Sequence, residues 1–177
     1  GARRLRINPG AGFGTGTHET TQLCLQAVGE GVASGRLLLS GRNVLDFGSG
    51  SGILSAGAAL LGAKHVDAVE IDSLANDNAF ENATLNGVEG LVRIQTELPV
   101  DSKYGLVFAN ILKPVLLEFC APLCERVNSG QAWLVLSGLV ENDVGPVTAA
   151  FQKRLGRAPT RVLNLNEWRA LVWESLL

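Results

Sequence analysis

Apolar residues in this chain form two kinds of pattern, short apolar runs and segments with helical spacing. The short runs are bounded by glycine or polar residues, which is typical of buried strands. These predicted strands are residues 43–48, 65–71, 91–95, 105–111 and 131–138. The predicted helices are residues 18–33, 53–63, 73–87, 112–127 and the second half of 140–155. Because strands and helices alternate, we expect a mostly parallel sheet with helices on both faces.

Particular residues predict where some of these helices begin, bend and end. Thr17 is the predicted N-cap of the first helix and Ser73 that of the third, because a hydroxyl oxygen accepts backbone N–H groups there. Gly87 ends the third helix. Pro114 fits the first turn of the fourth helix, whereas Pro122 should bend that helix. We therefore expect a fourth helix that is not straight.

The two ends of the chain lie outside this alternation. Residues 160–168 and 169–176 predict two further strands, which we expect to pair with each other. Residues 1–16 contain several glycines and are interpreted as an irregular leader. The 177 residues suit a single domain, and no run of 18 apolar residues predicts a transmembrane helix. No signal peptide is visible.

Composition narrows the class of protein. Hydrophobic residues make up 46% and charged residues 18%, and the formal net charge is −2, so nothing favours nucleic acid as a partner. Cys24, Cys120 and Cys124 form no CxxC pair and no even framework, which indicates reduced thiols in a cytoplasmic protein and no metal site. Methionine is absent, even at position 1, and we interpret the chain as a processed or excised product.

A glycine-rich loop follows the first predicted strand, where open parallel sheets bind ligands. Gly48, Gly50 and Gly52 have GxGxG spacing, and Asp46 stands just before them. A dinucleotide fingerprint would require glycine at position 53, which is Ile53, and no Gly-Lys-Ser/Thr sequence follows. The loop is either a simple tight turn or part of a cofactor site that does not hold a pyrophosphate.

An acidic residue at the end of the second strand favours the cofactor site. Glu70 follows Gly48 by 22 positions, close to the spacing of about 20 at which a carboxylate binds a ribose. A carboxylate accepts hydrogen bonds from both hydroxyls of a diol. Asp46 and Glu70 together would repel phosphate, so they favour a nucleoside that carries a cation. S-adenosylmethionine, which has a ribose and a positive sulfonium, is such a compound.

The fourth strand ends with Asn110, at the sheet edge where a reacting group would lie. It is either a turn residue or an acceptor of a hydrogen bond from a substrate amine, which it would orient for direct displacement. A lysine acceptor, with a reference pKa of about 10.4, must first lose a proton; His18, Glu19 or water are the candidates to take it. Residues 111–112 are Ile-Leu, with no aromatic, which favours an aliphatic amine over a base.

Four motifs occur in order along the chain: NPGAGFGTGTHETT, VLDFGSGSG, AVEID and FANIL. Together they resemble the ribosomal protein L11 methyltransferase (PrmA) family over nearly the whole chain. FGTGTHETT is the specific part, whereas the glycine loop and the acid are shared by all class I methyltransferases. The closing SGLVENDVGPV and EWRALVWES are also similar to that family.

The resemblance implies a three-layer, Rossmann-like class I methyltransferase fold with a seven-stranded sheet whose last strand is antiparallel. It implies S-adenosylmethionine-dependent methylation of lysine side chains or an N-terminal amine on a ribosomal protein. Phe13 would form a wall and Thr17 a contact in a segment that closes over the methionine end of the cofactor, and Asp72 would lie near the adenine. The implied cofactor-binding residues are Phe13, Thr17, Asp46, Gly48, Gly50, Glu70, Asp72 and Asn110, with Asn110 also catalytic.

This sequence departs from the family pattern in three places. Ser49 replaces the usual cysteine of the glycine loop, and Lys113-Pro114 replaces smaller residues beside the acceptor site. The separate amino-terminal substrate-recognition domain of the family is absent from residues 1–177, so we expect that it was removed or never existed. A methyltransferase for another protein or a small amine, and a non-catalytic S-adenosylmethionine-binding module, therefore stay open; a nicotinamide dehydrogenase is disfavoured by Ile53.

Overall fold

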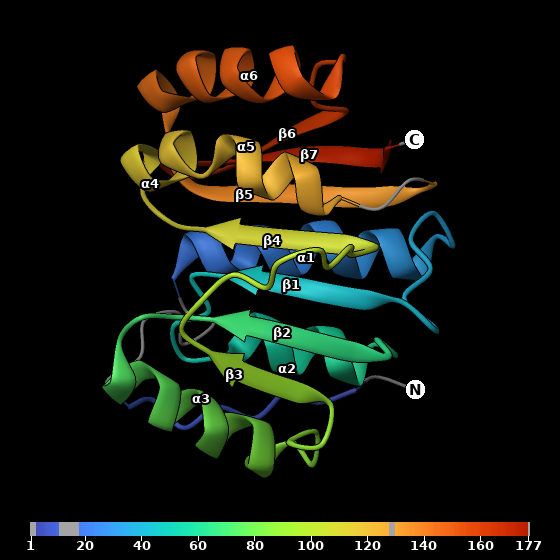
Figure 1. The fold of residues 1–177 in the computed structure, drawn as a ribbon, viewed down its shortest axis with the longest axis vertical. Helices are drawn as coiled ribbons and strands as arrows, with labels where there is room; N and C mark the ends of the chain where they lie inside the picture. The colour runs from blue at the N-terminus through green and yellow to red at the C-terminus, as the bar shows by residue number, and fades with distance from the viewer. Residues whose placement is uncertain (1–2, 11–17, 128–129, 177) are drawn as a thin grey trace.

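The computed structural model describes residues 3–10, 18–127 and 130–176. Its strands form one sheet in the order β3-β2-β1-β4-β5-β7-β6 (Figure 1). β7 runs antiparallel to both of its neighbours, and the other paired strands are parallel. The predicted sheet with an antiparallel last strand is confirmed. The strands are β1 (Asn43–Phe47), β2 (His65–Val69), β3 (Val92–Gln95), β4 (Leu106–Asn110), β5 (Ala132–Val140), β6 (Arg161–Leu165) and β7 (Trp168–Leu176).

Helices cover both faces of this sheet (Figure 1). α1 and α2 cover one face with α3 at its edge, and α4, α5 and α6 cover the other. β2 and β3 follow on one side of β1, and the chain then crosses from β3 to place β4 on the other side of β1. The switch point of the sheet therefore lies between β1 and β4. The helices are α1 (Glu19–Ala33), α2 (Ile53–Leu60), α3 (Ser73–Leu85), α4 (Lys113–Glu118), α5 (Cys120–Arg126) and α6 (Glu141–Leu155).

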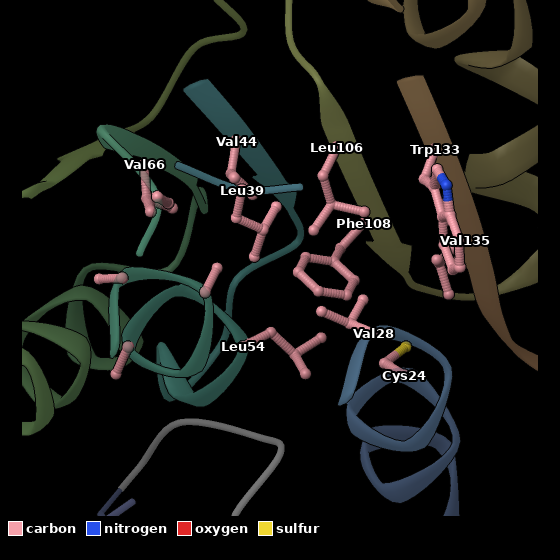
Figure 2. Close-up of a cluster of buried hydrophobic side chains, with 14 of the residues drawn as sticks. Cys24, Val28, Leu39, Val44, Leu54, Val66, Leu106, Phe108, Trp133 and Val135 are labelled. Carbon is pink, nitrogen blue, oxygen red and sulfur yellow. The ribbon is translucent and has the colours of Figure 1, made fainter. Parts of the chain in front are cut away.

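The core beneath α1 and α2 is built from small and branched side chains. Figure 2 shows Val28 of α1 and Leu54 of α2 beside Phe108 of β4. Every residue of α2 from Ile53 to Ala59 is buried, so this helix lies against the sheet as its small residues predict. Burial of this apolar surface is the main stabilising contribution to the fold.

The two predicted N-caps are wrong by one residue, whereas Gly87, with φ of +67°, does follow the end of the third helix as predicted. The N-cap of α1 is His18, whose ring nitrogen accepts the Thr20 N–H at 3.3 Å; the predicted cap, Thr17, lies outside the described residues. The N-cap of α3 is Asp72 and not Ser73, because Asp72 has extended backbone angles and its carboxylate accepts the Leu74 N–H at 3.0 Å. In both cases the polar side chain just before the helix takes the role.

Two predicted helices differ in extent from the structure. Residues 112–127 form two helices, α4 and α5, separated at Phe119; Pro122 lacks the N–H that would bond the Glu118 carbonyl, so the predicted bend is a break. α6 fills the whole segment instead of its second half. Its first turn is held by Asp143, which accepts the Val140 N–H at 3.0 Å, and the helix continues through its internal proline.

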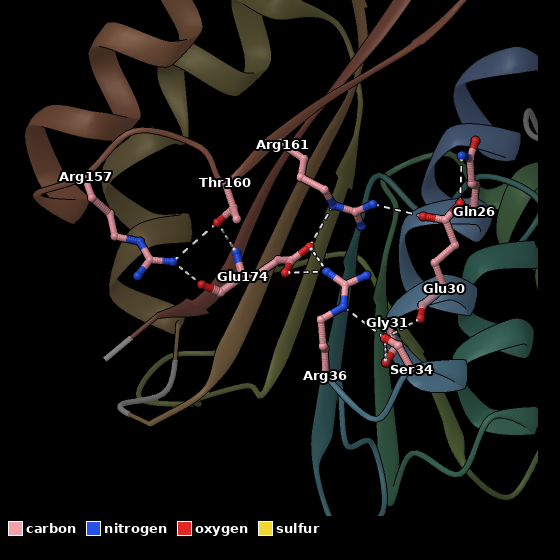
Figure 3. A network of polar contacts seen from close by, with 9 residues as sticks. All are labelled: Gln26, Glu30, Gly31, Ser34, Arg36, Arg157, Thr160, Arg161 and Glu174. Carbon is pink, nitrogen blue, oxygen red and sulfur yellow. Dashed lines mark hydrogen bonds and ion pairs between the residues drawn. The ribbon is translucent and has the colours of Figure 1, made fainter.

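A buried carboxylate joins α1 to the antiparallel end of the sheet. Both oxygens of Glu174 accept hydrogen bonds from Nη1 of Arg36, at 2.8 and 2.7 Å, and Nε of Arg161 lies 2.7 Å from Oε1 (Figure 3). Arg161 also reaches Glu30 of α1, at 2.9 Å. The network therefore connects residues that are up to 138 positions apart.

Candidate active site

The glycine loop joins the carboxyl end of β1 to α2. Gly48, Gly50 and Gly52 have φ of +77°, +53° and +75°, angles that residues with side chains rarely adopt. The Gly48 N–H donates to the Val69 carbonyl at 2.8 Å, which fixes the loop to the end of β2. A Cβ on Gly48 would lie 3.0 Å from Cδ1 of Ile111. The glycines therefore permit both the turn and the close approach of the end of β4.

Asp46 is buried directly before this loop, with 1% of its surface exposed. Its Oδ2 accepts a hydrogen bond from the Ser55 hydroxyl at 2.6 Å, and its Oδ1 has no hydrogen-bond partner among the described residues. Burial raises the pKa of Asp46 to about 6, and the charge of Glu70 contributes to the rise. Buried polar atoms are normally paired. Asp46 does not contribute to the described lining of either cavity at this edge, so it would favour a nearby positive charge through its own charge.

Glu70 follows β2 at the same edge of the sheet. Its N–H donates to the Gln95 carbonyl at 3.0 Å, and its carbonyl accepts from Nδ2 of Asn76 at 2.9 Å, so its backbone is held on both sides. Burial raises the pKa of Glu70, and the charge of Asp72 adds to this effect. Asp72 itself caps α3 and does not contribute to the described lining of either cavity at this edge.

Asn110 ends β4, where the amide nitrogen donates to Oγ1 of Thr21 in α1 over 3.5 Å. An amide that donates through nitrogen still has an oxygen that accepts. Gly138 of β5 makes the local packing possible, because a Cβ there would lie 2.9 Å from the Ile111 carbonyl oxygen and 3.3 Å from Oδ1 of Asn110. The position predicted from the strand pattern is therefore supported by α1 and β5.

Two cavities open at this edge and share Gly48, Glu70 and Ile111 in their walls. The first, of about 450 Å³, also includes Gly50 and Asn110, so four predicted site residues line it. The second, of about 460 Å³, is lined mainly by apolar side chains such as those of Val69, Leu98 and Phe119. An elongated ligand can therefore extend from a partly polar cavity to an apolar one past the Glu70 carboxylate.

Sequence reasoning missed the aromatic wall of the first cavity. Trp168 begins β7, and its ring centroid lies 5.3 Å from that of His18. The His18 ring is held by Oγ1 of Thr20, 2.8 Å from Nδ1. The absence of an aromatic after Asn110 in the sequence therefore does not mean that the cavity lacks one, because Trp168 arrives from a distant strand.

Some predictions about the site have no structural test. Phe13 and Thr17 lie outside the described residues, and the role of Asp72 near an adenine stays a prediction. Within residues 3–10, 18–127 and 130–176, no cluster of three or more His, Cys, Asp or Glu is arranged to hold a metal ion. In the same part of the chain, every helix is too short or too polar to cross a bilayer.

Comparison with solved structures supports the fold. The chain is 31% identical to a ribosomal protein L11 methylase from Lactobacillus delbrueckii subsp. bulgaricus, with a TM-score of 0.81 over 95% of this chain and 83% of that one. An RNA methyltransferase from Salinibacter ruber, solved with S-adenosyl-L-homocysteine, has a TM-score of 0.65 at 19% identity, over 89% of this chain and 93% of that one. The second likeness concerns the fold alone.

Two curated relatives are ribosomal protein L11 methyltransferases. A ribosomal protein L11 methyltransferase from Citrifermentans bemidjiense is 46% identical over 154 residues, which are 83% of this chain and 48% of that protein. One from Exiguobacterium sp. is 41% identical over 149 residues, 82% of this chain and 46% of that protein. The chain thus spans about half the length of these relatives. The family model for ribosomal protein L11 methyltransferase (PrmA) matches residues 2–175, and the chain therefore belongs to this family.

Proposed function

We propose that this chain is the catalytic unit of an S-adenosylmethionine-dependent methyltransferase that modifies lysine side chains or the N-terminal amine of ribosomal protein L11. The observation that carries the proposal is the place of Glu70, between an apolar cavity and one that contains Asn110. The names of the relatives supply the substrate. A ribosomal substrate would place the enzyme in the cytoplasm.

The residues present fit this cofactor. Glu70 would bind the ribose diol, the apolar cavity around Val69 and Phe119 would receive the adenine, and the glycine loop would take the amino-acid end. The unpaired Oδ1 of Asp46 supports a cationic ligand, because a positive charge nearby would offset the cost of ionising a buried carboxyl. When bound, the cofactor supplies a methyl group on a positively charged sulfur.

Asn110 and Trp168, which line the first cavity, would prepare the acceptor amine together with Thr21, which contacts Asn110. Oδ1 of Asn110 would accept one amine N–H and so direct the nitrogen lone pair, while Thr21 holds the amide nitrogen. The Trp168 ring would pack against the aliphatic part of a lysine and attract its ammonium group through a cation–π interaction. Holding the amine in a reactive orientation is a large part of catalysis in a displacement reaction.

The proton of the amine has a candidate acceptor in the same cavity. His18 lines it, whereas Glu19 does not contribute to its described lining. The pKa of Glu19 is lowered by a hydrogen bond from its own backbone N–H and by Asn166, which makes its carboxylate a weaker base. His18, directly or through water, is therefore favoured over Glu19 as the route for the proton.

The proposal is tested by incubating the protein with S-adenosylmethionine that carries a labelled methyl group. The acceptors would be purified ribosomal protein L11 and, separately, a ribosomal extract. We expect label on L11, and Asn110→Ala should reduce the transfer rate by about 100-fold while S-adenosylhomocysteine still binds. Mass spectrometry would identify the modified amine.

The other outcomes distinguish the alternatives. Label on a different protein of the extract would overturn L11 as the substrate and leave the chemistry intact. Cofactor binding without transfer to any acceptor tested would support the non-catalytic module. Full transfer by Asn110→Ala would show that the acceptor amine lies elsewhere.

A further inference from the structure

Three buried or partly buried asparagines follow one another along α3 at four-residue spacing. Asn78 and Asn82 therefore lie on the same face of the helix, and Asn86, the C-cap of α3, follows them at the same spacing. Asn78 and Asn82 are 3% and 1% exposed. Buried amides at helical spacing are costly unless each is hydrogen-bonded, so their partners show what this face of α3 contacts.

The partners are backbone groups of the segment before α1, residues 3–10. Asn86 accepts the Arg6 N–H at 2.8 Å and donates to the Arg6 carbonyl at 2.7 Å. Oδ1 of Asn82 accepts the Asn8 N–H at 2.6 Å, and Nδ2 of Asn78 donates to the Asn8 carbonyl at 2.9 Å. The asparagines thus bind the main chain of the segment, which runs antiparallel to α3.

The spacing of the two elements explains why they match. Two residues of an extended chain cover about 6.6 Å, and four residues of a helix cover about 6 Å. Arg6 and Asn8 can therefore each meet the next asparagine along α3. Leu5 and Ile7, which alternate with Arg6 and Asn8, pack on the hydrophobic core instead, so both sides of the segment are held.

Among the described hydrogen bonds of the three asparagines, that of Asn82 alone reaches the glycine loop. Its Nδ2 donates to the Ser51 carbonyl at 2.8 Å, inside the glycine loop. Beside it, a Cβ on Gly52 would lie 2.8 Å from Cβ of Ala79, so α3 already touches the loop there. A single buried amide therefore bonds the loop on one side and residues 3–10 on the other.

We propose that Asn82 is a positioning residue that holds the glycine loop in its cofactor-binding path through the bond to the Ser51 carbonyl, while the Asn8 N–H orients the Asn82 amide. The inference rests on the proposed function, because it assumes that the loop binds the cofactor. Asn82 acts through Ser51 and does not line either cavity in the part of the chain that the structure describes. Its loss should therefore weaken cofactor binding more than the methyl transfer step.

The test compares three variants by calorimetric titration with S-adenosylhomocysteine. Asn82→Ala removes both bonds of the amide, and Asn82→Asp keeps the acceptor for the Asn8 N–H but loses the donor to Ser51. Asn86→Ala is the matched control, because it releases Arg6 without touching the loop. We expect both Asn82 variants to bind about tenfold more weakly, and Asn86→Ala to bind within about twofold of the wild type.

Two further readouts separate positioning from general destabilisation. Hydrogen exchange of the peptide that contains residues 3–10 should increase in Asn82→Ala and Asn86→Ala, and less in Asn82→Asp. In the transfer assay, Asn82→Ala should raise KM for S-adenosylmethionine while kcat stays within about twofold of the wild-type value.

The outcomes that overturn the inference differ from those that overturn the function. If the wild type binds but Asn82→Ala binds as tightly, Asn82 does not position the loop. If Asn86→Ala weakens binding as much as Asn82→Ala, anchoring of residues 3–10 is responsible and the bond to Ser51 is not. A wild type that does not bind S-adenosylhomocysteine would overturn the proposed function itself.

Discussion

At the scale of single residues, the site contains two carboxyl groups that are costly to ionise. Asp46 and Glu70 both have a raised pKa, mainly because they are buried. The charge of Glu70 also contributes to the shift of Asp46, whereas the charge that adds to the raised pKa of Glu70 is that of Asp72. Functional sites often retain such groups at the expense of stability, so removal of the Asp46 charge should stabilise the fold.

Replacing Asp46 by asparagine should change how stability depends on pH. The folded-state pKa of about 6 lies above the ordinary 3.8, so the folded protein binds this proton more tightly than the unfolded chain. The resulting stabilisation is complete below about pH 4 and is lost as the pH rises to about 6. Because asparagine does not titrate, Asp46→Asn should be more stable than the wild type at pH 7, by up to about 3 kcal/mol.

Urea unfolding of both proteins at pH 4.5 and pH 7 would measure this difference. The wild type should lose free energy of unfolding, relative to the variant, between the two pH values. An equal change in the free energy of unfolding of both proteins would contradict the conclusion that burial raises the pKa of Asp46. Titration with S-adenosylhomocysteine should show weaker binding by the variant, because the site then lacks one negative charge.

Site residues could be predicted where a local pattern marks them. Glu70 and Asn110 stand at the ends of apolar runs, and the carboxyl ends of parallel strands meet at one edge. Trp168 and Gly138 could not be found in this way, because they reach the cavity through the packing of β5 and β7. No local feature of a strand start or a strand glycine indicates which distant segment it will contact.

At the scale of elements, α1 crosses β5 where a glycine meets a tryptophan. A Cβ on Gly31 would lie 2.5 Å from Cη2 of Trp133, whereas a Cβ on Gly29 would have no neighbour within 4 Å. Trp133 is fully buried and one of the residues drawn in Figure 2. The distance between α1 and the sheet therefore depends on the missing side chain at position 31.

These two glycines of α1 predict opposite effects of the same substitution. Gly29→Ala should raise the free energy of unfolding by about 0.5–1 kcal/mol, because alanine favours a helix more than glycine does. Gly31→Ala should lower it by about 2 kcal/mol, since the methyl group would displace Trp133. Denaturant unfolding of both variants checks the pair. A stabilising effect at position 31 would mean that α1 moves away from β5 at little cost.

The elements themselves were largely predictable, and the errors have identifiable causes. The sequence predicts that Pro122 bends one helix and that residues 140–155 are helical only in their second half. Pro122 in fact separates α4 from α5, whereas Pro146 lies inside α6. The sequence does not show which outcome applies, because it depends on whether neighbouring strands hold the helix together.

At the scale of the whole molecule, the Glu174 network joins α1 to the strands that come last in the chain. Glu174→Ala would leave the guanidinium groups of Arg36 and Arg161 without their common partner, and we expect a loss of about 2–3 kcal/mol in the free energy of unfolding. Glu30→Ala is the control, since its pair with Arg161 is exposed and should contribute little. Thermal unfolding in low and high salt would separate the two.

Equal effects of the two Glu variants would contradict a special role of the buried carboxylate. Salt should reduce the effect of Glu30→Ala and leave most of that of Glu174→Ala, because buried pairs are screened less than exposed ones. The network itself was not predictable, since it connects Arg36 with a glutamate 138 positions away. By contrast, the alternation of strands and helices was enough to predict the fold class.

The place of β7 has a consequence for how the protein is made. β7 lies between β5 and β6, although residues 168–176 are translated after both. Until these residues leave the ribosome, β5 keeps an unpaired edge, and β6 has no strand beside it. Because chains generally fold from the amino terminus during synthesis, the first five strands can assemble early, but the finished sheet must wait for release of this segment. Nascent chains halted before Trp168 should therefore be the ones that chaperones retain.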